Sequence, residues 1–206
     1  MKIMTRRKEK ASFARKLRAR TRSRPEDAQE ADIPALYLTE YFTTGSPKAL
    51  DALAVTLRAA CEEVGFFSIV GHQTPSSDIQ DLFEMVRRLH AVSEGVKRDL
   101  MMDRLDWPVG GIGYRPVSSR KLPARPTANL NETFIVKRDH ELSFDGNRWP
   151  GPSVLPEFRE KVETYTLAME RLGKRLLLVF AAALGMPISF FDEAFIEPQY
   201  RLRMTH

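Results

Sequence analysis

The spacing of apolar residues along the chain predicts three helices. Apolar residues recur every three or four positions over residues 47–64 and about 77–92, as one buried helix face requires. The same spacing runs through about 30 residues, 155–183, and predicts the longest helix, with one continuous buried face. Gly65 follows the first helix where a left-handed cap is typical. The inward residues expected are Leu50, Leu53, Leu57, Ala60 or Cys61, and Val64, then Ile79, Leu82, Phe83, Val86 and Leu89, then Leu155, Phe158, Val162, Tyr165, Met169, Leu172, Leu176, Val179 and Ala183.

Short β-prone runs predict strands between these helices. Residues 33–38, Ile-Pro-Ala-Leu-Tyr-Leu, predict a short strand, because proline is tolerated at a strand start. Residues 66–70, Phe-Phe-Ser-Ile-Val, are too short for a helix and predict a buried strand that ends at Gly71. Residues 133–136 predict a further strand, and residues 199–206 predict an extended end.

Glycine and proline interrupt this pattern between Asp106 and Ala128. Their density breaks any regular element, so we expect a long loop there, and loops of this length are commonly functional or disordered. The order of elements predicts an α+β fold that is mostly helical with a few strands. Residues 32–206 form this domain, and residues 1–31 precede it as a basic, disordered tail.

The net charge of +5 is distributed unevenly. Residues 1–24 contain eleven Lys or Arg and one acid, Glu9, whereas the other 182 residues carry 21 bases and 26 acids. The basic segment has no apolar core of the kind a secretory signal requires, so we do not expect export. We interpret it as a solvated extension or the product of an early translation start. The functional alternative is an arm that binds nucleic acid or anionic lipid.

Length and composition exclude several other classes of protein. The 206 residues are 43% hydrophobic and 29% charged, which is typical of a globular chain. The longest apolar stretch, residues 176–186, is far shorter than the roughly 20 residues of a membrane-spanning helix. The single cysteine, Cys61, excludes an internal disulfide, and its place on an apolar helix face predicts a packed core thiol. We expect a cytoplasmic protein that does not bind membranes.

A direct search of the sequence identifies no complete active site. An iron site of the two-histidine, one-carboxylate type commonly begins with a histidine and an acid two residues later. None of the histidines, His72, His90, His140 and His206, has that neighbour. No Gly-Lys-Ser/Thr follows the glycines of residues 110–113, so a phosphate loop is not predicted. We therefore predict no catalytic residue and no metal ligand within these 206 residues.

Short motifs occur in a fixed order through the body of the chain. Residues 33–36 and then 60–72, Ala-Cys-Glu-Glu-Val-Gly-Phe-Phe-Ser-Ile-Val-Gly-His, resemble the "I-P-x-I … A-C-x-x-x-G-F-F-x-I-x-N-H-G" opening of the isopenicillin N synthase-like oxygenases. Gly71 and Gln73 depart from that pattern beside His72. The combination covers residues 32–206 and is specific, although each piece alone is weak. The later motifs are Ser93–Lys97, Gly113-Tyr114, Asn131–Phe134, Trp149-Pro150, Phe158-Arg159 with Tyr165, and Leu202–His206, which resembles "L-R-x-x-H-Y-P".

The resemblance implies a non-haem iron(II) oxygenase, of which most members use 2-oxoglutarate and dioxygen to hydroxylate, desaturate or cyclise a small molecule. It also implies that the helical domain leads into a double-stranded β-helix, or jelly-roll, barrel that is incomplete in this chain. In the family the His-x-Asp, the distal histidine and the Arg-x-Ser that holds 2-oxoglutarate all follow the "H-Y-P" strand, whereas this sequence stops at His206. We therefore expect an N-terminal part that is inactive alone and needs a C-terminal catalytic half as its partner.

The segments that flank the long loop supply candidate substrate contacts. In a barrel oxygenase the chemistry of the metal-binding half is constant, so the loops that reach over the barrel mouth select the substrate. We therefore predict substrate binding by Tyr114, Arg115, Asn131 and Glu132. The alternative is that Tyr114 and Phe134 belong to the core and that Arg115 is solvated.

The incomplete barrel and the basic tail lead to further expectations. The inward face of the longest helix is expected to lack part of its cover and to promote self-association. One rival function is a non-catalytic interaction module with a nucleic-acid-binding arm, whose binding would weaken steeply with salt. A second rival is a regulatory fragment that pairs with a complete oxygenase. The helix face in question comprises Leu155, Val162, Met169, Leu172, Leu176 and Val179.

Overall fold

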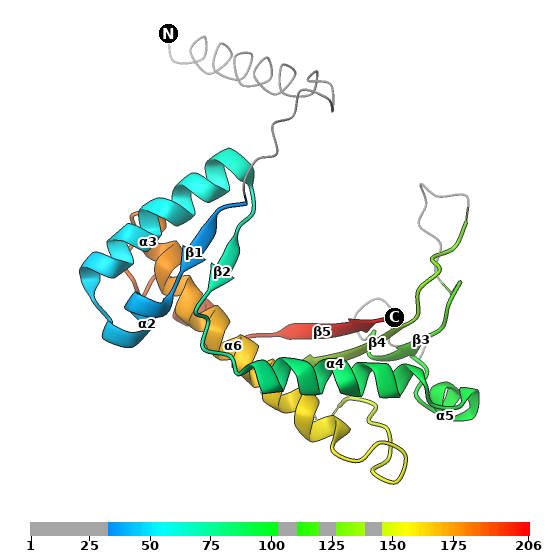
Figure 1. Ribbon diagram of the computed structural model, residues 1–206. Helices are drawn as coiled ribbons and strands as arrows, with labels where there is room; N and C mark the ends of the chain where they lie inside the picture. The colour runs from blue at the N-terminus through cyan, green and yellow to red at the C-terminus, as the bar shows by residue number, and fades with distance from the viewer. Residues whose placement is uncertain (1–32, 103–110, 120–126, 139–145) are drawn as a thin grey trace.

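One long helix, α6 (Phe158–Ala183), joins two lobes of the molecule (Figure 1). The computed structural model describes residues 33–102, 111–119, 127–138 and 146–206. The C-terminal half of α6 packs in the N-terminal lobe, which contains both parallel strands. Its N-terminal half packs in the sheet lobe, which contains three antiparallel strands. None of the described helices is long and apolar enough to cross a membrane.

The N-terminal lobe is a small parallel sheet covered by helices. Leu36 lies opposite Ile69 in the ladder, and Leu36 and Leu38 are fully buried against α3 and α6. The Ser46 side chain accepts a hydrogen bond from the Ala49 N–H at 3.5 Å, which caps the start of α3. The elements of this lobe are β1 (Ala35–Tyr37), α2 (Thr39–Thr44), α3 (Pro47–Ala59), the π-helical turn η2 (Ala60–Val64) and β2 (Ser68–Val70).

The π-helical turn η2 continues α3 and changes which side chains are buried at its end. The Gly65 N–H donates to the Ala60 carbonyl at 2.9 Å, a five-residue step that shifts the phase of the turn. Ala60 stays buried, but Cys61 is exposed, so the prediction of a packed core thiol is wrong. Gly65 has φ 94° and provides the predicted left-handed cap. The prediction of a buried strand over residues 66–70 is also wrong in part. Ser68 and Val70 of β2 are exposed, and only the opposite face of this strand is partly buried.

The sheet lobe places three antiparallel strands against α4 and α6. β4 lies in the centre, with Tyr114 opposite Phe134 on one side and Met204 opposite Phe134 on the other. Phe134 is fully buried and meets Phe158 edge to face, with ring centroids 5.9 Å apart. The elements of this lobe are α4 (Ser76–His90), α5 (Glu94–Asp99), β3 (Gly113–Arg115), β4 (Thr133–Arg138) and β5 (Tyr200–Thr205). A 3₁₀ turn, η4 (Glu193–Phe195), lies beside the C-terminal half of α6.

Two sequence predictions about this lobe are wrong. The apolar spacing predicts that Phe83 faces inward from α4, but this side chain is 71% exposed and Met85 is buried instead. The segment predicted to be a loop throughout contains β3, because glycine allows the backbone to turn sharply into the sheet. Gly113 has φ 95°, and the neighbouring Tyr114 N–H donates to the Leu100 carbonyl at 2.7 Å.

The apolar face of α6 is covered, contrary to expectation. Val162, Leu172 and Val179, with Leu155 just before the helix, are each less than a tenth exposed, since α4 covers the first part of the helix and α3 the second. Met169 and Leu176 are partly buried. Exposed apolar side chains occur instead after the helix. They are Leu184, Met186, Ile188, Phe190, Phe195 and Ile196.

Candidate functional site

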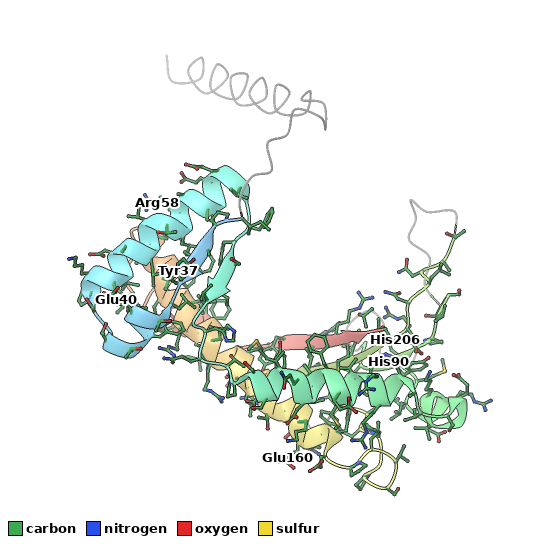
Figure 2. All side chains as sticks on the ribbon, in the orientation of Figure 1. Tyr37, Glu40, Arg58, His90, Glu160 and His206 are labelled. Carbon is green, nitrogen blue, oxygen red and sulfur yellow. The ribbon has the colours of Figure 1, made fainter. Side chains whose placement is uncertain are left out.

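A buried polar cluster joins five segments of the sheet lobe. Glu132, just before β4, accepts from the Lys97 Nζ of α5 at 3.1 Å and from the Tyr114 hydroxyl of β3. These three residues are 8%, 7% and 5% exposed. His90 at the end of α4 and His206 after β5 complete the cluster (Figure 2).

The charge of Glu132 is stabilised by its partners. Burial raises the pKa of this carboxyl, but the hydrogen bonds from Tyr114 and Lys97, with the charges of Lys97 and His90, lower it below its usual value. Burial and the hydrogen bond to Glu132 raise the pKa of Tyr114. The result is an ionised glutamate held by a neutral phenol and a lysine in a desolvated site.

His90 and His206 close one side of the cluster. Their rings stack with centroids 5.2 Å apart, and the Nδ1 of His206 lies 3.6 Å from Glu132 Oε1. The Nδ1 of His90 lies 2.8 Å from the Val86 carbonyl oxygen, while its buried Nε2 has no partner among the described residues. Burial is the largest influence on the pKa of His90 and lowers it. Burial therefore disfavours the protonated imidazole.

The described residues do not fit an iron site. Within ranges 33–102, 111–119, 127–138 and 146–206, no three His, Cys, Asp or Glu side chains converge on a point that could hold a metal ion. The Glu132 carboxylate instead accepts from Lys97 and Tyr114, as a structural tie requires. His140 lies outside the described residues.

The structure brings two of the four predicted substrate contacts together. Tyr114 and Glu132 hydrogen-bond to each other and are buried. Arg115 and Asn131 are their chain neighbours and are partly exposed, with Arg115 Nη2 lying 3.2 Å from the Met102 sulfur. Substrate contact by these residues stays a prediction. The sequence search overlooked Lys97 as a site residue, because the contact that buries it is 35 positions away and leaves no local pattern.

A second buried ion pair connects α6 to the sheet. Arg138 Nε of β4 lies 2.6 Å from Glu170 Oε2, and both side chains are about a tenth exposed. The Tyr200 hydroxyl of β5 donates to the same carboxylate at 3.1 Å, and Lys174 pairs with its other oxygen. Burial raises the pKa of Glu170, but the bonds from Lys174 and Tyr200 and the charge of Arg138 lower it overall. These contacts fix the strand direction of β4 and β5 against the helix.

Comparison with known families identifies this architecture. Residues 33–157 match the family described as non-haem dioxygenase in morphine synthesis, N-terminal. The chain belongs to this family. The ordered motifs that resemble isopenicillin N synthase-like oxygenases are thereby confirmed.

Curated relatives are identical to this chain at about 30% of the aligned positions. The 2-oxoglutarate-dependent dioxygenase citB of Monascus ruber is 31% identical over 188 residues, which are 84% of this chain and 55% of the relative. Isopenicillin N synthase of Streptomyces clavuligerus is 30% identical over 176 residues, which are 81% of this chain and 52% of the relative. The chain spans about half the length of the curated relatives that it matches.

Solved structures share the fold at lower identity. A 2OG-Fe(II) oxygenase family protein from Caulobacter crescentus has a TM-score of 0.69 and 19% identity, covering 84% of this chain and 55% of that one. A full-length Neurospora crassa protein, solved in complex with alpha-KG and thymine, has a TM-score of 0.67 and 15% identity, covering 85% and 56%. The helical part of the predicted α+β fold is thus confirmed, while the described strands do not form a closed barrel.

Proposed function

We propose that this chain is the N-terminal region of an iron(II)- and 2-oxoglutarate-dependent oxygenase that acts on a small molecule. The observation that carries the proposal is the family match over residues 33–157. Relatives named 2-oxoglutarate-dependent dioxygenases support it, since they align with 84% of the chain. The iron ligands and the arginine for 2-oxoglutarate belong to a catalytic half that corresponds to the part of the relatives outside the alignment.

The residues of this chain would then serve as the frame of the catalytic barrel. The ion pair of Arg138 with Glu170 holds β4 on α6, and that of Lys97 with Glu132 holds the start of β4 on α5. β4 is paired on both sides, so its fixed position also fixes β5, which is an outer strand of the described sheet. We assign the pairing of further strands to the open edge of β5.

We further propose that Arg115 and Asn131 contact the substrate, with Tyr114 and Glu132 anchoring them. Both candidates flank residues 116–130 and are partly exposed. Their side chains offer a cation and an amide to polar groups of a small molecule. The neighbouring Neurospora crassa structures, which hold thymine or 5-formyluracil, support a small polar molecule as the substrate class.

Kinetics of the full-length enzyme test this assignment. In that enzyme, Arg115→Ala and Asn131→Ala should each raise KM for the primary substrate about 5- to 30-fold, the value of one or two lost polar contacts. Uncoupled decarboxylation of 2-oxoglutarate should persist, because neither residue touches the metal. The control is Arg171→Ala, an exposed arginine on α6, which should leave KM unchanged. Equal loss of both activities with a lowered Tm would show that the two residues are structural.

The reading frame beyond the codon for His206 tests the wider proposal. We expect the frame to continue with Tyr-Pro, then His-x-Asp, a distal histidine and Arg-x-Ser. A stop codon at this point in the genomic sequence, with no such motifs encoded, would overturn the assignment of a catalytic half to the same protein. A regulatory chain that pairs with a separate oxygenase would then be the better interpretation.

A further inference from the structure

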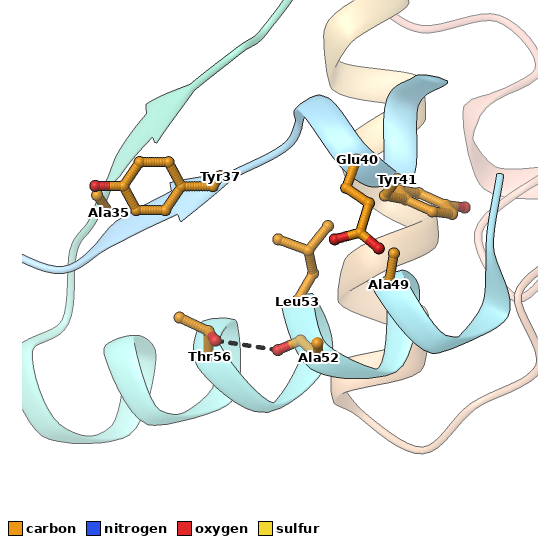
Figure 3. Close-up of a pocket in the computed structure, with 8 residues that line it drawn as sticks. All are labelled: Ala35, Tyr37, Glu40, Tyr41, Ala49, Ala52, Leu53 and Thr56. Carbon is orange, nitrogen blue, oxygen red and sulfur yellow. Dashed lines mark hydrogen bonds between the residues drawn. The ribbon is translucent and has the colours of Figure 1, made fainter. Parts of the chain in front are cut away.

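An open pocket lies in the N-terminal lobe, far along the chain from the polar cluster. Its volume is about 260 Å³, and it lies between β1, α2 and α3. Figure 3 shows the ring of Tyr37 at one end and the Glu40 carboxylate, beside Tyr41, at the other. Small and apolar side chains of α3 form the floor: Ala49, Ala52, Leu53 and Thr56.

The Glu40 carboxylate is available to a ligand. It is exposed, and it has no ion pair or side-chain hydrogen bond within the part of the chain that the structure describes. Tyr37 is 68% exposed, so its ring is accessible from solvent. A carboxylate with aromatic rings around an apolar floor suits the cationic head and methylene stem of a lysine or arginine.

The same chain contains a segment with that chemistry. Residues 1–24 carry eleven Lys or Arg and one acid, whereas the rest of the chain has an excess of five acids. Ala35, which lines the pocket, follows this segment after only ten residues, 25–34, which span at most about 35 Å when extended. A short connection keeps the local concentration of the cations in the millimolar range near the pocket.

We propose that the pocket of Tyr37, Glu40 and Tyr41 binds a lysine or arginine side chain from residues 1–24 of the same molecule. The carboxylate pairs with the cationic head, and the stem lies over the small side chains of α3. The interaction gives the basic segment a role within its own chain, without any binding of nucleic acid. It is independent of the proposed oxygenase activity, because the pocket lies in the other lobe from the polar cluster.

Zero-length carbodiimide cross-linking of the full 206-residue chain tests the proposal. This reagent joins a carboxylate to a lysine in direct contact, and the segment contains Lys2, Lys8, Lys10 and Lys16. We expect a cross-linked peptide between Glu40 and one of these lysines. Tyr37→Ala keeps the carboxylate but removes one aromatic wall, so it should lower the yield about two- to fivefold. Because Tyr37 is largely exposed, its replacement should not unfold the chain, and a lower cross-linking yield would report on the pocket.

Protease protection gives a second readout that does not need the Glu40 cross-link. Glu40→Gln should speed tryptic cleavage within residues 1–24 about two- to fivefold, because the docked state is depopulated. The control is Glu62→Gln, an exposed acid of η2 that does not line the pocket; it should leave the rate unchanged. Equal effects of both variants, or cross-links spread evenly over exposed acids, would overturn the proposal.

Isotope mixing separates docking within one molecule from docking between copies. Equal amounts of ¹⁴N- and ¹⁵N-labelled chains should give Glu40 cross-links within a single label. Mixed-label peptides would show that a second copy supplies the cation and would contradict docking within the molecule. Cross-links confined to the acids of residues 25–32 would likewise contradict it.

Discussion

Replacing Glu132 with glutamine removes the charge at the centre of the buried polar cluster. Among the described residues, Lys97 would keep only Glu94 as an acidic partner; it lies 3.4 Å away and is 77% exposed, so solvent screens that pair. Removing one partner of a buried ion pair costs about 3–5 kcal/mol. We expect the lower end, about 3 kcal/mol, because the amide oxygen still accepts from Tyr114 or Lys97. A chain of this size should then lose about 6–12 °C in Tm.

A double-mutant cycle with Lys97→Met isolates the pair. Urea unfolding followed by circular dichroism gives the free energy of unfolding of each variant. Each single variant should lose about 3 kcal/mol, while the double variant should lose at least 2 kcal/mol less than the sum, because neither charge is left unpaired. Glu94→Gln is the control and should cost less than about 1 kcal/mol. Additive losses, or a Glu132→Gln variant as stable as the parent, would refute the role of the cluster as a structural tie.

Two other predictions concern pH and backbone geometry. The pKa values of His90, Glu132 and Glu170 are lowered in the fold. Their contributions to stability are therefore present above the usual pKa values, 6.5 for the histidine and 4.5 for the glutamates. These contributions are lost as the pH falls below those values. Urea unfolding from pH 8 to 4 should show this loss, first from the histidine and then from the glutamates; a flat profile would contradict it. Gly113→Ala should destabilise the chain by about 2–3 kcal/mol, because φ is +95° and the added Cβ would meet a backbone carbonyl oxygen at 2.5 Å. Gly173→Ala, a helical position with nothing within 4 Å of the added atom, should be neutral or stabilise by up to about 1 kcal/mol in the same urea assay, and equal losses at the two glycines would contradict the strain argument.

Local apolar spacing located the helices well, because a helix face is encoded over neighbouring turns. The predicted 47–64, 77–92 and 155–183 correspond closely to α3 with η2, α4 and α6. The spacing was misleading at Phe83, which has the right period but no partner element beside it to cover it, and at Cys61, where a π-helical turn shifts the phase.

Features that depend on distant contacts left no local signal. β3 lies in a glycine-rich segment and becomes a strand because β4 pairs with it. The burial of Lys97 depends on Glu132, which is 35 positions away. The family motifs contained both residues, in Ser93–Lys97 and Asn131–Phe134, but only the fold brings them together. Substrate contact by Tyr114 and Glu132 stays a prediction, and their mutual hydrogen bond favours an anchoring role for both.

Release of succinate from 2-oxoglutarate is the most direct test of the oxygenase assignment. The 206-residue chain, supplied with iron(II), dioxygen and 2-oxoglutarate, should form no succinate, because its described residues do not bring together a metal site. The protein extended through the rest of its reading frame should form succinate and retain about one iron per chain after gel filtration. Succinate from the 206-residue chain alone, or none from the extended protein under the same conditions, would contradict the account.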